Sequence, residues 1–132
     1  MQQGNRLLYY RKAWLFVGYS LVAFVVYSSL TSSPVKVEVN NFDKYAHTFG
    51  YFVLMGWFVQ LYQTPKSVFV CAVLFIIMGV GLEFIQGATG YRQFDIYDMM
   101  ANTLGVLIAW VLSLTRFPCL LKYFEKYVIK VE

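Results

Sequence analysis

The hydrophobic positions of this chain fall into four long blocks that are separated by short polar connections. The pattern predicts helices over residues 14–30, 43–62, 67–86 and 95–115. Each block approaches the roughly 20 residues that an α-helix needs to cross about 30 Å of hydrocarbon. The second block becomes uncharged only after His47, so its helix reaches full length only when the preceding polar turn is included. We therefore predict an all-α integral membrane bundle of four transmembrane helices.

The end of the chain carries a different pattern, in which apolar residues recur at helical spacing with lysines between them. The apolar positions are Leu120, Leu121, Phe124, Tyr127, Val128 and Val131, and the lysines are Lys122, Lys126 and Lys130. This pattern predicts an amphipathic helix over residues 118–131 that lies on the membrane surface. Because the sequence shows no internal repeat and no low-complexity segment, we expect residues 1–132 to form a single membrane domain.

Composition supports the membrane assignment. The sequence is 59% hydrophobic and 20% aromatic, and only 14% of its residues are charged. A soluble domain carries about 25% charged residues, so this chain has too little polar surface to cover a core in water.

The first block follows Arg6, Arg11 and Lys12, as in a signal peptide, but it is long for such a segment, and we expect a retained helix. Cys71 and Cys119 show neither metal-ligand nor disulfide spacing, so free thiols are expected.

The distribution of lysine and arginine predicts the orientation of the bundle. Eight of these residues belong to the end that carries both chain termini: Arg6, Arg11, Lys12, Lys66, Arg116, Lys122, Lys126 and Lys130. Three belong to the opposite end: Lys36, Lys44 and Arg92. Since cytoplasmic loops are enriched in lysine and arginine, we expect the N- and C-termini to be cytoplasmic. The basic residues do not form a patch with interleaved aromatic residues, so no nucleic-acid partner is predicted.

Polar residues within the predicted helices gather at the end of the bundle away from the termini. One motif begins the second helix and comprises Asp43, Lys44, His47, Tyr51 and Leu54. The other runs from the third helix into the fourth and comprises Glu83, Gln86, Arg92, Asp95, Asp98, Asn102 and Gly105. Because exposing these side chains to lipid would be costly, we expect the polar faces of the three helices to face one another.

The polar residues divide by chemistry into two candidate groups. Those that could transfer a proton, and are therefore the catalytic candidates, are His47, Asp43, Glu83, Asp95 and Asp98. The candidates for substrate binding are Lys44, Tyr51, Gln86, Arg92 and Asn102. We predict no cofactor and no metal, because Lys44 and Arg92 would compete with a cation for the carboxylates. The sequence leaves open whether the site is catalytic.

Each of these residues also has a structural explanation. Asp95 and Asp43 are suited to capping the fourth and second helices. Gln86 and Asn102 are suited to hydrogen bonding between helices. Tyr51 could be a core residue that places its hydroxyl at the polar end. The charged groups together could form an ion-pair network that holds the bundle, since such networks also perturb pKa values.

The two motifs resemble the VanZ-like family, which is named after a protein associated with teicoplanin resistance. The resemblance covers roughly residues 17–110 and includes every position of both motifs. It implies a multi-pass protein of the bacterial cytoplasmic membrane that is connected with the cell envelope. It implies little about a reaction, and it does not make this chain a resistance factor.

The leading hypothesis is an envelope-facing site for an anionic lipid-linked precursor. In it Lys44 and Arg92 bind phosphate or carboxylate, and His47, oriented by Asp43 or Asp98, acts as acid or base in any catalysis. One alternative is a small transporter component, which would require a homo-oligomer to form a conducting path. The other is a non-catalytic scaffold whose ion pairs are structural.

Overall fold

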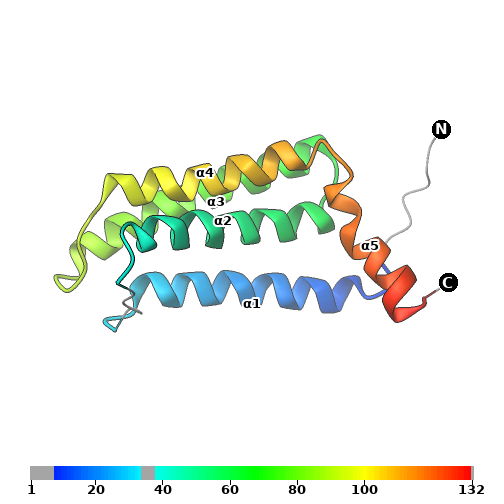
Figure 1. Ribbon diagram of the computed structural model, residues 1–132, viewed down its shortest axis with the longest axis horizontal. Helices are drawn as coiled ribbons and strands as arrows, with labels where there is room; N and C mark the ends of the chain where they lie inside the picture. The colour runs from blue at the N-terminus through cyan, green and yellow to red at the C-terminus, as the bar shows by residue number, and fades with distance from the viewer. Residues whose placement is uncertain (1–7, 34–37, 132) are drawn as a thin grey trace.

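The computed structural model describes residues 8–33 and 38–131, and these segments are helical, with no strand among them. Four long helices lie side by side, and two loops join them at one end of the bundle (Figure 1). Their bounds are α1 Arg11–Leu30, α2 Phe42–Leu61, α3 Pro65–Ala88 and α4 Ile96–Leu112. We call the end with the α1–α2 and α3–α4 connections the loop end, and the opposite end the tail end. The predicted all-α class is therefore confirmed.

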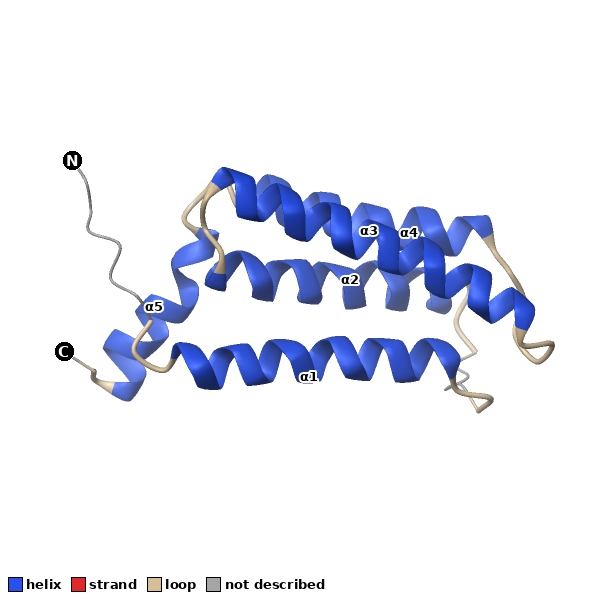
Figure 2. Ribbon diagram, turned by 180° about the vertical axis from the view of Figure 1, so that it is seen from behind, coloured by secondary structure: helices blue, strands red, loops and turns tan. Residues whose placement is uncertain are grey.

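The segment after α4 turns away from the bundle and crosses its tail end (Figure 2). It consists of the 3₁₀ turn η1 (Phe117–Cys119), the short helix α5 (Leu120–Phe124) and the π-helical turn η2 (Glu125–Ile129). The axis of this segment makes an angle of 80° with α4. Leu121 is buried and packs with Leu8 and Leu61, so the tail lies against the protein as well as presenting exposed apolar residues such as Tyr127 and Val128.

Local sequence signals explain where the helices begin. The hydroxyl of Thr64 accepts a hydrogen bond from the backbone N–H of Ser67 at 3.2 Å, and Pro65 occupies the first position of α3. Both features are typical of helix N-termini. The carboxylate of Asp95 caps α4 by accepting from the N–H of Tyr97 at 2.8 Å. The capping role considered for Asp95 is thus present, whereas in α2 the cap position belongs to Asn41.

Among the described residues, α1 and α3 are long and apolar enough to cross a membrane, and a third span results if α4 and the tail helix are counted together. The start of α2 carries Asp43, Lys44 and His47, which lower its hydropathy, and α4 has only 17 residues. The fold is therefore a helical membrane-type bundle. The count of four spans stays a prediction.

The helices α2 and α4 form the tightest pair. A Cβ added to Gly105 of α4 would overlap the backbone carbonyl oxygen of Thr48, and it would lie 2.8 Å from the backbone nitrogen of Phe52. Glycine here lets the two backbones approach closely, as small residues do in membrane helix pairs. Between this crossing and the tail end, apolar side chains such as Met55 and Val106 are fully buried. The close approach brings the polar first turns of α2 and α4 together.

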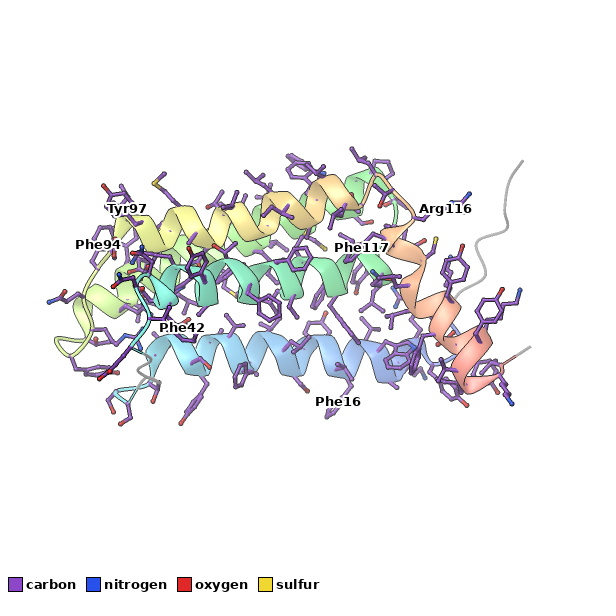
Figure 3. The ribbon with its side chains drawn as sticks, viewed as in Figure 1. Phe16, Phe42, Phe94, Tyr97, Arg116 and Phe117 are labelled. Atoms are coloured by element: carbon purple, nitrogen blue, oxygen red, sulfur yellow. The ribbon has the colours of Figure 1, made fainter. Side chains whose placement is uncertain are left out.

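In contrast, α1 lies at the edge of the bundle. Its contact with α2 includes Gly18, where an added Cβ would lie 3.0 Å from Trp57 and 3.1 Å from Phe58. Large apolar side chains of α1 are exposed, including Phe16, which points away from the bundle in Figure 3. This exposure suits a helix that faces lipid on most of its circumference.

Candidate functional site

The centre of the loop-end site is the ammonium group of Lys44, in the first turn of α2. Its Nζ atom donates to Asp43 Oδ2 at 2.7 Å, to Asp95 Oδ2 at 2.6 Å and to Asp98 Oδ1 at 2.5 Å. Asp95 and Asp98 come from the cap and first turn of α4. One lysine thus holds three carboxylates and joins the beginnings of two helices.

The four side chains of this Lys44 cluster differ in their exposure to solvent. The exposed fraction of the side chain is 60% for Asp43, 35% for Asp95, 26% for Lys44 and 12% for Asp98. Asp43 and Asp95 therefore present carboxylate surface at the loop end, while Asp98 lies behind them. The Lys44 ammonium and the N–H of Tyr97 hold the pKa of Asp95 below its usual range.

His47 lies one turn further along α2 and contacts α4 through both ring nitrogens. Its Nδ1 lies 2.9 Å from Asn102 Oδ1, within hydrogen-bonding distance. Its Nε2 lies 3.5 Å from Asp98 Oδ2, which is an electrostatic contact beyond the usual hydrogen-bond length. The spacing of Asp98 and Asn102, four residues apart on one helix face, explains why one imidazole reaches both.

Glu83 and Tyr51 complete the buried side of the site. The Oε1 atom of Glu83 accepts from the backbone N–H of Asp95 at 2.8 Å, and the residue is 1% exposed. Glu83 therefore ties the end of α3 to the start of α4. The hydroxyl of Tyr51 is buried without a hydrogen-bond partner among the described residues. A Cβ at Gly79 would lie 3.2 Å from Asn102 and 3.3 Å from Tyr51, which places both side chains against α3.

Two of the sequence-predicted residues lie on another side of the bundle. Gln86 donates to the backbone carbonyl of Ser29 at 2.6 Å. Arg92 donates to the carbonyl of Thr31 through a contact of 3.5 Å, at the limit of a hydrogen bond. Both therefore secure the end of α1, as does the hydroxyl of Tyr91, which donates to the Leu30 carbonyl at 2.8 Å. The structure brings together the other eight candidates, from Asp43 to Asn102, and separates these two from them.

The family model described as VanZ/LLP1 matches residues 2–118, which is most of the chain. The chain belongs to the VanZ/LLP1 family.

One relative in this comparison is the protein named "Uncharacterized protein C11E3.10" of Schizosaccharomyces pombe. It is 32% identical to this VanZ/LLP1 chain over 101 residues, which cover 71% of the chain. The chain spans 59% of the length of that relative. No solved structure matches. The family assignment confirms the resemblance drawn from the two motifs.

The donor set of this VanZ/LLP1 site also has the composition of a hard-cation site. One oxygen from each of Asp43, Asp95 and Asp98 lies within 4.8 Å of the others, and carboxylate oxygens are the ligands that Mg²⁺ and Ca²⁺ prefer. The Lys44 ammonium contacts the same three carboxylates. The lysine thus already supplies a positive charge at the position that a metal ion would take.

A buried polar contact that the two sequence motifs do not include lies at the tail end. The carboxylate of Glu125 accepts from the backbone N–H groups of Tyr9 and Tyr10 at 2.8 and 2.9 Å, and from Trp14 Nε1 at 2.6 Å. It therefore fixes the backbone just before α1, a helix whose N-cap residue Tyr10 makes no side-chain cap hydrogen bond. Burial acts to raise the pKa of Glu125, but the three hydrogen bonds outweigh it and hold the pKa below its usual value. The sequence signal for this role is the position of Glu125, which lies four residues after Leu121 and three before Val128 and therefore on an apolar face of the tail.

Proposed function

We propose that this cell-envelope membrane protein binds the polar head group of a lipid-linked envelope precursor at its loop end. One observation carries the proposal: Asp43 and Asp95 are partly exposed, and Lys44 holds both in place against a buried polar network. Carboxylates fixed in this way lose little conformational entropy on binding, which favours recognition. The proposal is one of binding and assigns no bond-making step.

The charge of the cluster decides which part of a head group it accepts. An ammonium group has three donors, and Lys44 uses three hydrogen bonds on its three aspartates. Lys44 would therefore have to leave a carboxylate in order to bind phosphate. We assign the aspartates to amine and hydroxyl donors of the head group, and we assign the anionic linkage to Arg92. The guanidinium of Arg92 has five donors and makes one marginal contact here, with Thr31.

The remaining candidates support the exposed carboxylates. Asn102 and Asp98 hold His47, and Glu83 fixes the backbone of Asp95. In the proposal these buried residues set the positions of the two exposed acids. His47 contacts Asp98, which lies behind those acids, and does not itself contact the head group. Gln86 positions the end of α1, where Arg92 also makes its contact.

The proposal includes a topology. We infer that α1 to α4 each cross a bacterial cytoplasmic membrane, the setting that a lipid-linked envelope precursor implies, with the tail end in the cytoplasm. At about 1.5 Å per residue, the 20 residues of α2 extend about 30 Å, and the 17 of α4 about 25 Å. The excess of lysine and arginine at the tail end supports this orientation.

Cysteine labelling tests the topology. In a variant with Cys71 and Cys119 replaced by alanine, single cysteines are placed at the exposed positions Ser33 and Lys126. A membrane-impermeant maleimide added to intact cells should label Ser33→Cys and should label Lys126→Cys only after the cells are opened. The reverse pattern would overturn the orientation.

Native mass spectrometry of the protein released from its membrane tests the binding site. Asp43→Asn removes the most exposed carboxylate charge, and Arg92→Ala removes the assigned anion contact. Glu38→Gln is the matched control, because it neutralises an exposed acid that precedes α2 and lies outside the cluster. A co-purifying lipid-linked species should fall about tenfold in the first two variants, the effect of one charge-assisted hydrogen bond, and stay constant in the control. An unchanged amount in both site variants would reject the proposal.

The alternative function is a scaffold in which the cluster only locks α2 to α4. The observation that favours it is that Lys44 is fully hydrogen bonded within the protein. A scaffold predicts that Asp43→Asn lowers thermal stability and leaves bound lipid unchanged. A binding site predicts lost ligand with stability preserved, because Asp43 is the member most exposed to solvent.

A further inference from the structure

A second binding region lies at the tail end, on the opposite half of the bundle from the aspartates. It is a groove between α1 and α3 with a volume of about 570 Å³, within the range of about 300–1,000 Å³ typical of ligand sites. Its walls come from Tyr19 and Val22 of α1 and from Val70 and Leu74 of α3. Phe58 of α2 also lines it. We define these residues, with Lys66 at the mouth, as the tail groove.

The polarity of the tail groove changes along its length. Thr64, Lys66 and Ser67 line one end, where α3 begins, and apolar residues line the remainder as far as Leu74. Since α3 rises about 1.5 Å per residue, the eight positions from Lys66 to Leu74 extend about 12 Å toward the middle of the bundle. A polar mouth above an apolar slot of this depth matches a lipid that has its head at the interface and a chain in the hydrocarbon.

The mouth carries positive charge. Lys66 lines it and has no carboxylate partner in the described part of the chain. The guanidinium of Arg11 lies 5.1 Å from the centre of the Tyr62 ring, another lining residue, and donates to the Leu61 carbonyl at 3.1 Å. Within the described segments, 8–33 and 38–131, no acidic residue lines the groove. The charge therefore complements an anionic head group.

A second groove provides the contrast. It lies between α1 and α2 toward the loop end, has a volume of about 520 Å³, and is lined by residues such as Phe42, Phe49 and Val53. Among the residues that the structure describes, no charged side chain lines it. The cations at the mouth therefore distinguish the tail groove from an apolar surface that any lipid chain would cover.

The volume of the tail groove suits a single extended chain better than another helix. A helix about 10 Å across and 30 Å long takes up roughly 2,400 Å³, several times the space of the tail groove. We propose that the tail groove binds one acyl chain of an anionic phospholipid, with the phosphate of that lipid against Lys66. This site is independent of the loop-end aspartates and requires only that the bundle lies in a bilayer.

Lipid binding to the purified full-length protein tests the proposal. The protein in neutral detergent is mixed with equal amounts of phosphatidylglycerol and phosphatidylcholine, and the bound lipids are counted by native mass spectrometry. One lysine near a membrane surface contributes about 1 kcal/mol toward anionic lipid, so the wild type should retain phosphatidylglycerol about fivefold better. Lys66→Gln should remove this preference, and Lys66→Arg should restore it.

Two further variants distinguish lipid binding in the tail groove from a general attraction of anionic lipid to the basic residues of the protein. Lys126→Gln removes an exposed tail lysine outside the groove and should leave the preference unchanged. Val70→Trp fills the slot and should reduce retention of both lipids, with its thermal unfolding measured to confirm that it folds. A wild type without preference, or a Lys66→Gln variant that keeps it, would overturn the proposal.

Discussion

The ammonium of Lys44 lies 2.5 Å from a carboxylate oxygen of Asp98, and this contact joins the first turn of α2 to the first turn of α4. The two residues are 54 positions apart in the sequence. Asp98 is 12% exposed, so the pair is shielded from water more than a surface ion pair would be. Such shielding makes the removal of one partner costly, because the other charge stays buried.

Replacement of Lys44 by methionine should therefore destabilise the bundle. The change leaves three carboxylates without their shared cation, and because the cluster is partly solvated we expect a loss of about 1–3 kcal/mol. Thermal unfolding in detergent measures the effect, with Lys126→Met as the control on an exposed lysine. Equal stability of the Lys44 and Lys126 variants would show that the ion pairs contribute nothing to the fold.

Gly105→Ala should weaken the α2–α4 pair. The added methyl group would overlap the Thr48 carbonyl oxygen, which belongs to the backbone and cannot rotate away. Overpacking of this kind costs about 1–3 kcal/mol. Gly81→Ala is the matched control, because a Cβ at Gly81 meets nothing within 4 Å and alanine is the better helix former. The first variant should unfold at lower temperature, and the second at the same or a higher one.

Glu125→Gln should loosen the tail from α1. The variant replaces the carboxylate that accepts three hydrogen bonds with a neutral amide. A hydrogen bond to a charged group contributes about 1.5–3 kcal/mol to the free energy of unfolding. Proteolysis within residues 120–131 should become faster, and Trp14 fluorescence should shift because its indole N–H donates to Glu125. Unchanged cleavage would mean that the other contacts of the tail, such as buried Leu121 and its N–H bond to Gln60, hold it in place without Glu125.

The same contact should depend on pH in a defined direction. The pKa of Glu125 is lower in the folded protein than its usual value near 4.5. Its stabilisation is therefore fully present above the unfolded-state pKa, and it is lost as the pH falls through the lower folded-state value. Tail cleavage by an acid-active protease should rise below about pH 4 in the wild type. In Glu125→Gln, cleavage should be high at every pH. If cleavage of that variant depended on pH as it does in the wild type, Glu125 would not be the group responsible.

Tyr51→Phe should leave the free energy of unfolding unchanged or raise it by about 1 kcal/mol. The hydroxyl has no partner among the described residues, and a buried unpaired polar group is costly. A phenylalanine ring retains the packing against Gly79. A loss of more than about 2 kcal/mol in chemical denaturation would instead indicate a hydrogen bond to the Tyr51 hydroxyl in the folded protein.

The hydrophobic pattern and the two polar motifs are enough to predict the helical class, the gathering of polar residues at one end and the family. Helices follow from long apolar blocks because a membrane-embedded backbone must satisfy its own hydrogen bonds. The grouping of Asp43 with His47 on one helix face, and of Asp98 with Asn102 on another, also follows, since a four-residue spacing places side chains on the same side of a helix.

Which polar groups pair with one another depends on how the helices pack. Gln86 and Glu83 belong to the same motif and lie three residues apart on α3. They nevertheless contact different neighbours: Gln86 donates to Ser29 of α1, and Glu83 accepts from Asp95. Lys44 was expected to bind an anionic ligand, and the close approach of α2 and α4 at Gly105 surrounds it with carboxylates instead. Periodicity specifies the face of one helix, whereas the partner of that face depends on the packing and rotation of another helix, which sequence spacing does not record.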